Sequence, residues 1–163
     1  RVIRDTDRNL RLFAFVKKYA ASEMDRWSLD QYRPYVIMMN TRARSSLILK
    51  DNPAGGIDQA IECFDSGIGK IIAFYNEYGI ASEIENSMEL SILKSLKREF
   101  LRIRRRESQL EERLAQAVRE ERFEDAAKLR DMLRIKDMGD TGIPPLSGSR
   151  RKPGGHKNDG GKS

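Results

Sequence analysis

The sequence has 163 residues, with 34% charged, 39% hydrophobic and a formal net charge of +6, so it admits one modest domain with appendages and excludes two large domains. This balance is typical of a helical protein with wide solvated faces, whereas a buried sheet would need more Val and Ile. Because it lacks a membrane-length apolar run and a signal peptide, and holds one cysteine, Cys63, and one histidine, His156, we expect a soluble cytoplasmic protein without disulfides or Cys/His zinc sites.

An amphipathic helix is predicted first, over residues 8–20, where apolar side chains recur at helical spacing among Arg and Lys residues. Further on, Pro34 suits the first turn of a helix, because its missing N–H would be unpaired there. We therefore expect a short helix around Trp27 and a longer one over 35–49. A strand over 35–39 is the open alternative.

The chain between the third and fourth predicted helices, residues 51–56, is rich in Asn, Pro and Gly and is predicted to form a loop. An apolar stripe then predicts a helix over 57–78. Gly67 and Gly69 lie inside this helix, where glycine costs about 1 kcal/mol relative to alanine, so we expect them to mark close helix packing. Gly79 is predicted to end the helix.

The next helix is predicted to begin at about Glu83, because Ser82 and Glu85 form an S-x-x-E capping box. Its last half is crowded with Lys and Arg. Cations at a helix C-terminus complement the helix dipole by about 0.3 to 1 kcal/mol each, which favours simple end-charging. A nucleic-acid or acidic-partner surface is the alternative, although no aromatic residues interleave with the charges to stack on bases. The residues named for nucleic-acid contact are Arg102, Arg104, Arg105 and Arg106, together with Arg150, Arg151 and Lys152 near the C-terminus.

A second S-x-x-E box, Ser108 with Glu111, predicts that a new helix starts at residue 108. A charged turn follows, and a further helix is predicted to begin at Phe123. Residues 139–163 are rich in Gly, Pro, Ser and charge, and they hold too little apolar surface to offset the entropy of ordering. We expect this basic tail to be disordered.

The run from Phe123 to Asp131 reads F-E-D-A-A-K-L-R-D and follows a leucine-bearing helix and a charged turn. On these residues, the segment from about Ser108 to Lys136 resembles a UVR motif, the helical hairpin named after the UvrB and UvrC subunits of excinuclease. The resemblance covers a small part of the chain. Arg122 departs from it, since family members often have an acidic or other polar residue in the turn.

Physical reasons for the residue choices stand beside the resemblance. Two helices approach closely where side chains are small, which Ala126 and Ala127 provide, while Phe123 is expected at the tip of the hairpin. A hairpin of this size rarely folds alone, so a partner or the rest of the chain must cover its apolar face. The residues predicted to take part in protein interaction are Leu110, Leu114, Val118, Phe123, Ala126, Ala127, Leu129 and Leu133, with Arg130 and Asp131 setting the register.

Residues for catalysis or metal binding are not evident, because the chain has no P-loop, dinucleotide-binding, nucleophile-elbow or H-E-x-x-H pattern. Asp58, Glu62 and Asp65 would share one face of a helix and would suit a metal or an acid–base pair, but a solvated face is favoured. Around Pro34, Tyr32, Arg33 and Tyr35 are expected to form a buried network rather than an exposed recognition edge. We therefore expect no catalytic residue, no cofactor and no metal.

The fold class predicted is all-α, with a helical bundle over 5–106 of unassigned role, an antiparallel UVR hairpin over 108–137 and a disordered basic tail over 139–163. The resemblance implies a bacterial, non-enzymatic adaptor or scaffold. Its partner would be another protein, such as one with its own UVR hairpin, or a second copy of itself. The alternative is a DNA-associated accessory factor in nucleotide excision repair, which would bind nucleic acid through the basic helix end and the tail.

Overall fold

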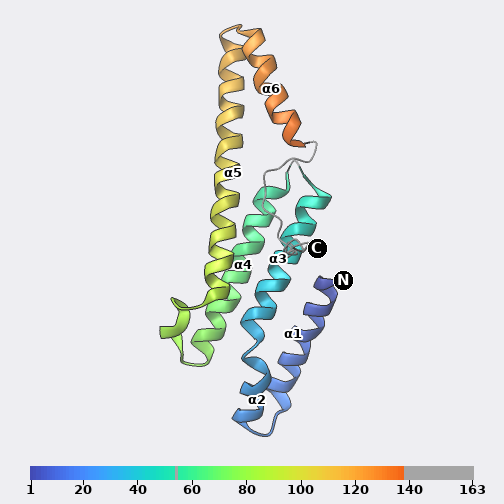
Figure 1. The fold of residues 1–163 in the computed structure, drawn as a ribbon, viewed down its shortest axis with the longest axis vertical. Coiled ribbons are helices and arrows are strands. Elements are labelled where there is room, and N and C mark those ends of the chain that lie inside the picture. Colours follow the sequence, from blue (N-terminus) through green and yellow to red (C-terminus); the bar gives the residue numbers. More distant parts are fainter. Residues whose placement is uncertain (54, 138–163) are drawn as a thin grey trace, which may run out of the picture.

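The computed structural model describes residues 1–53 and 55–137, and these residues form helices with no strand among them. The predicted all-helical fold is confirmed. None of the described helices is both long and apolar enough to cross a membrane. The basic tail predicted over 139–163, with Arg150, Arg151 and Lys152, lies outside the described residues. In chain order the elements are α1 (Val2–Tyr19), α2 (Glu23–Asp30), α3 (Arg33–Asp51), α4 (Gly56–Glu77), the 3-10 helix η1 (Ala81–Ile84), α5 (Met88–Arg119) and α6 (Phe123–Asp137) (Figure 1).

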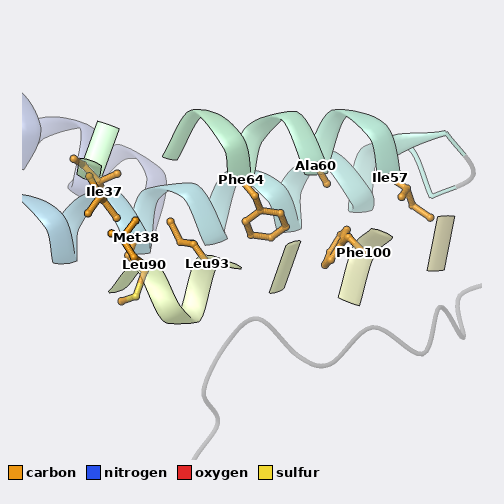
Figure 2. Packing of buried hydrophobic residues seen from close by; sticks show 9 residues of the cluster. Ile37, Met38, Ile57, Ala60, Phe64, Leu90, Leu93 and Phe100 are labelled. Atoms are coloured by element: carbon orange, nitrogen blue, oxygen red, sulfur yellow. The ribbon is translucent and has the colours of Figure 1, made fainter. Parts of the chain in front are cut away.

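The main core lies between α3, α4 and α5 (Figure 2). At its centre the fully buried rings of Phe64 and Phe100 meet edge to face, with their centroids 5.1 Å apart, and so join α4 to α5. Pro34 lies in the first turn of α3 as predicted, and residues 35–39 are helical, so the strand alternative is wrong. The buried members of the cluster are Ile37, Met38, Ile57, Ala60, Phe64, Ile71, Leu90, Leu93 and Phe100.

Close packing of α3 on α4 occurs at one of the two glycines singled out in the sequence. A Cβ atom on Gly67 would lie 2.3 Å from the Oγ1 atom of Thr41, so only glycine fits between the helices there. The expectation is confirmed at Gly67. It is wrong at Gly69, which is exposed and would bring a Cβ atom near nothing within 4 Å.

The predicted stop of α4 at Gly79 is confirmed, since this residue has φ = 67° and the N–H of Ile80 donates to the carbonyl of Tyr75 at 3.0 Å. The predicted start at Glu83 is wrong. The chain first makes η1, which packs Ile84 against the core cluster, and α5 begins only at Met88.

Ser87, not Ser82, caps α5, because its hydroxyl accepts a hydrogen bond from the N–H of Leu90 at 3.2 Å. The second predicted start, at Ser108, is also wrong, because α5 continues unbroken to Arg119. No Gly or Pro interrupts α5, and Ser108 is an exposed residue that a helix interior tolerates. The division into domains at residues 106 and 108 stays a prediction, and α5 runs through it.

The helix α1 begins at Val2, earlier than predicted, and packs on α3 with Phe13 buried. Polar contacts fix it there. The Nδ2 atom of Asn40 on α3 donates to Thr6 Oγ1 at 2.8 Å and to Asp7 Oδ1 at 2.7 Å. Arg44 donates a hydrogen bond to the Asp7 carboxylate at 2.8 Å. The hydrogen bonds from Arg44 and Asn40 lower the pKa of Asp7, although desolvation acts to raise it. These contacts therefore hold one side of α1 against α3.

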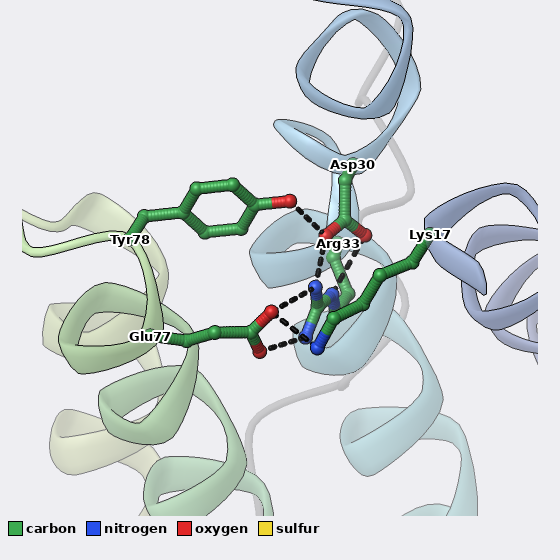
Figure 3. Close-up of polar contacts among 5 residues, drawn as sticks. All are labelled: Lys17, Asp30, Arg33, Glu77 and Tyr78. Atoms are coloured by element: carbon green, nitrogen blue, oxygen red, sulfur yellow. Dashed lines mark hydrogen bonds and ion pairs between the residues drawn. The ribbon is translucent and has the colours of Figure 1, made fainter. Parts of the chain in front are cut away.

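A polar network joins the ends of α1, α2, α3 and α4 (Figure 3). Asp30 is 1% exposed, and its carboxylate accepts hydrogen bonds from Arg33 Nε at 2.7 Å and from the Tyr78 hydroxyl at 2.6 Å. Arg33 also pairs with Glu77 at 3.0 Å, and Lys17 of α1 pairs with the same carboxylate. Burial alone would lower the pKa of Arg33. Its hydrogen bonds with Asp30 and Glu77 outweigh this effect, so the pKa of Arg33 lies above its ordinary value.

The expected tyrosine and arginine network around Pro34 is correct for the arginine and wrong for both tyrosines. Arg33 enters the network and lies 5.0 Å from the centroid of the Phe74 ring. Tyr32 and Tyr35 are 57% and 52% exposed, and Tyr78 of α4 supplies the phenol instead. The prediction chose Tyr32 and Tyr35 because they lie close to Arg33 in the sequence. The phenol in the network comes instead from Tyr78, which lies far along the chain.

Candidate functional site

The helix α6 folds back along the C-terminal half of α5, away from the main core (Figure 1). A second, smaller cluster lies between these two helices. Ala117 on α5 is 1% exposed, and Ala126 and Leu129 on α6 are each 8% exposed. Leu110 and Leu114 pack against them and are partly buried. The small side chains of the two alanines let the helices approach closely.

The turn between α5 and α6 has the hydrogen bonds of a Schellman motif. The N–H of Arg122 donates to the carbonyl of Ala117 at 2.9 Å, and the N–H of Glu121 donates to that of Val118 at 3.2 Å. Glu121 has φ = 57°, the left-handed conformation that glycine usually supplies at this position. The turn is thus tight, and it places Phe123 at the first position of α6.

Arg122, the residue that departs from the resemblance, holds the turn with ion pairs. Its guanidinium contacts the carboxylate of Glu120 at 2.8 Å and that of Asp125 at 2.9 Å. Gln116 donates a further hydrogen bond to Glu120 at 2.9 Å. The hydrogen bonds from Gln116 and Arg122 lower the pKa of Glu120. The departure at Arg122 therefore changes the polar surface of the turn and leaves its backbone intact.

Two of the predicted interaction residues point to solvent beside this turn. Phe123 is 68% exposed and Val118 is 51% exposed, although both are large and apolar. Met132 on α6 is 57% exposed and was missed by the sequence analysis. Helical spacing alone does not identify Met132 as an interaction residue, because charged residues lie on both sides of it in the sequence.

The remaining predicted interaction residues fall into two groups. Ala126, Leu129, Leu110 and Leu114 lie in or against the small cluster, while Ala127 and Leu133 are half-buried. Arg130 and Asp131 are exposed and pair with each other at 3.3 Å. The structure thus separates residues that hold the two helices together from residues open to a partner.

The basic residues of α5 are partly neutralised by α4. Arg104 pairs with Asp58 at 2.6 Å and Lys97 pairs with Asp65 at 2.5 Å, so the two aspartates considered for a metal or an acid–base pair lie in ion pairs. Within the described ranges no group of three or more His, Cys, Asp or Glu residues is placed to hold a metal ion.

Elsewhere in this basic stretch the side chains face solvent. Arg102 is 80% exposed and pairs with Glu99 at 3.3 Å. Arg105 and Arg106 are exposed, and no ion pair joins either to the described part of the chain. Of the four arginines named for nucleic-acid contact on α5, two therefore keep their charge without a carboxylate partner here.

Comparisons with known proteins bear on the C-terminal part of the chain. Neither the curated proteins nor the solved structures gave a match. A family model does match, and it covers the segment that includes the small cluster, the Schellman turn and the exposed ring of Phe123. Residues 105–134, the end of α5 and most of α6, match the model of the UvrB/uvrC motif.

Proposed function

We propose that this protein is a non-catalytic adaptor or scaffold of the bacterial cytoplasm that binds another protein through its C-terminal end. In this proposal a helical bundle carries an antiparallel hairpin, made by the end of α5 and α6. The observation that supports it most is the exposure of Phe123, which leaves 68% of its surface in solvent inside the segment that matches the UvrB/uvrC motif. Motifs of this kind generally mediate protein–protein interaction.

The packing of the hairpin supports a docking role. Among the side chains that the structure describes, its own cluster buries three residues, two of them alanines, so little apolar surface is removed from water there. Phe123 and Val118 lie outside that cluster and gain from contact with a partner. An aromatic anchor that fills a pocket in a partner contributes about 2 kcal/mol or more to binding. The partner proposed is a protein with a complementary apolar groove, such as another UVR hairpin.

Crosslinking from position 123 tests this function directly. A photoreactive phenylalanine analogue in place of Phe123 is expected to form a covalent product with one protein in the source cell. The matched control carries the same analogue at Met88, which is 72% exposed at the start of α5 and far from the hairpin. A product specific to position 123 supports the function. Equal products from both positions, or none from position 123, would contradict it.

Nucleic-acid binding in excision repair is the second candidate. It is favoured by Arg105 and Arg106, which are exposed and lack an ion pair within the described residues. The ion pairs of Arg102 and Arg104 weigh against it. Binding through phosphates makes affinity fall steeply as salt rises. The test is duplex DNA binding at two salt concentrations, with and without residues 139–163 and with Arg105→Glu and Arg106→Glu combined; no measurable affinity at low salt would rule this function out.

A further inference from the structure

The outward side of α1 carries apolar side chains that the fold does not cover. Leu12, Phe15 and Tyr19 are 49%, 60% and 61% exposed, and their spacing places them on one side of the helix. The ring centroids of Phe15 and Tyr19 lie 4.7 Å apart. Phe13, by contrast, is buried. Exposed aromatic residues grouped in this way mark an interaction surface.

Two arginines complete this surface. Arg8 precedes Leu12 by one helical turn and Arg11 precedes Phe15 by one turn, and both side chains are exposed. Neither makes an ion pair with the described residues, whereas Lys17 of the same helix is paired with Glu77. We call Arg8, Arg11, Leu12, Phe15 and Tyr19 the α1 face. It combines apolar contact area with positive charge, and Arg11 also lies close enough to Asp7 to help lower the pKa of that carboxyl.

The turn between α5 and α6 has the opposite character. Val118 and Phe123 are exposed apolar residues. Glu121 and Glu124 lie close to Phe123 in sequence, and neither has an ion pair within the described chain. The neighbouring Arg122 pairs with Glu120 and Asp125 instead. We call Val118, Glu121, Phe123 and Glu124 the tip surface. It is complementary to the α1 face, because both surfaces hold exposed apolar residues and their charges are opposite.

These two surfaces lie toward opposite ends of the molecule. The tip surface is at one end of the long axis, and α1 runs toward the other end, where it turns into α2 (Figure 1). Two copies related by a two-fold axis across this long axis would each bring their tip surface toward the α1 face of the other. Such an arrangement is closed, since both contacts are used in the pair and none remains to add a third copy.

We propose that two copies of this chain form an antiparallel pair in which the tip surface of each docks on the α1 face of the other. This inference rests on the proposed function and names a second copy as the partner of the hairpin. Each contact is small compared with a standard protein interface, so both are needed for a stable pair. The pair is expected to form at micromolar protein concentration and to weaken as salt rises.

Charge reversal in the full-length chain tests the pairing. One variant combines Arg8→Glu with Arg11→Glu, and the other combines Glu121→Arg with Glu124→Arg. Each alone places like charges across both contacts, so we expect association to weaken at least about tenfold in sedimentation equilibrium. A matched control, Lys50→Glu with Lys70→Glu, changes exposed charges elsewhere and is expected to associate like the unaltered chain.

Mixing the two variants is the decisive step. In a mixed pair, the reversed tip of one copy meets the reversed α1 face of the other, and the remaining contact has its natural charges. We therefore expect a 1:1 mixture to recover the dimer mass that neither variant reaches alone. Circular dichroism checks that both variants keep their helices, and recovery in the mixture would itself require two folded chains.

Several outcomes would overturn the pairing. These are a mixture that stays monomeric, single variants that associate like the unaltered chain, or a mass that keeps rising beyond the dimer. An unaltered chain that stays monomeric while position 123 crosslinks to a different protein would overturn the pairing and leave the proposed function standing. A dimer restored by mixing, without any crosslink to another protein, would assign the hairpin to self-association.

Discussion

Glu121 adopts a left-handed backbone conformation, φ = 57°, at the position of the α5–α6 turn where glycine is most common. For a residue with a Cβ atom this conformation costs about 1 kcal/mol. The side chain of Glu121 makes no ion pair within the described residues that would offset the cost. The turn therefore holds its shape through its backbone hydrogen bonds and the ion pairs of Arg122.

We expect Glu121→Gly to raise the free energy of unfolding by about 0.5 to 1 kcal/mol, because glycine removes the backbone penalty. Glu124→Gly is the control. It removes the same charge but places glycine in the first turn of α6, where it is expected to lower stability by up to about 1 kcal/mol. Urea unfolding followed by circular dichroism measures both. A loss of stability in Glu121→Gly would contradict the role assigned to this turn.

Gly67 and Gly69 offer a matched pair in α4. Gly67→Ala brings a methyl group to 2.3 Å from Thr41 Oγ1, so we expect a loss of about 1 to 3 kcal/mol from overpacking. Gly69→Ala meets no atom within 4 Å and is expected to gain about 0.5 to 1 kcal/mol from helix propensity. Thermal unfolding of the two variants provides the comparison, and equal shifts in the same direction would refute the close contact of α3 with α4.

For single residues, the sequence predicts which positions need an apolar side chain better than it predicts how exposed each of those side chains is. Ala117 and Val118 are apolar neighbours on one helix, yet Ala117 is 1% exposed and Val118 is 51% exposed. The angle at which α6 crosses α5 decides which of them is covered. That angle depends on the packing of both helices, which helical spacing along one of them does not contain.

Among the elements, the contact of α4 with α2 and α3 contains a buried carboxylate, Asp30, that depends on Arg33 and Tyr78. Burial and then the hydrogen bond to Asp30 raise the pKa of Tyr78 to about 12, from an ordinary value of 10.0. The folded protein therefore holds the phenol proton more tightly than the unfolded chain. The stability that this provides is fully present below pH 10 and is lost as pH rises through about 12.

We expect the stability difference between the unaltered chain and Tyr78→Phe to shrink as pH rises from 10 to about 12. Below that window the variant is less stable, since Asp30 loses one hydrogen-bond donor in a buried site. Other groups titrate in both proteins, so their contributions cancel in the difference. Urea unfolding at a series of pH values measures it, and a difference that stays constant across this window would contradict the assigned hydrogen bond.

Helix starts show where sequence patterns mislead. The two S-x-x-E patterns, at Ser82 and Ser108, both predicted a start, and neither begins a helix. The first falls in η1, and the second lies on the exposed side of α5, where a serine and a glutamate suit any helix interior. Ser87 is the true cap and has no glutamate three residues later. A capping box therefore indicates a start only where the chain also changes direction.

For the whole molecule, the two apolar clusters share no residue, and α5 carries both. Its first part packs in the main core through Leu90, Leu93 and Phe100, and its last part packs against α6 through the buried Ala117 and the partly buried Leu110 and Leu114. Composition and helical spacing predicted the all-helical fold, because composition indicates how much solvated surface a chain has and spacing indicates which segments form amphipathic helices. They did not predict a single helix through both parts, since its continuity depends on the absence of a competing turn.

We expect the fragment of residues 1–106 to fold without α6, because every buried member of the main cluster lies within it. Circular dichroism on heating is expected to show one cooperative transition for this fragment. The unaltered chain serves as the reference. A fragment that melts without cooperativity would show that the α5–α6 pair is part of one indivisible fold, against the predicted division of the chain.

The central claim, that the exposed ring of Phe123 binds a partner, is tested most directly with Phe123→Ala. Phe123 is 68% exposed, so the free energy of unfolding is expected to change by less than about 0.5 kcal/mol. Affinity for the protein crosslinked from position 123 is expected to fall by about 2 kcal/mol or more, measured by titration calorimetry. Unchanged affinity together with a lowered melting temperature would mean that the ring belongs to the protein's own core.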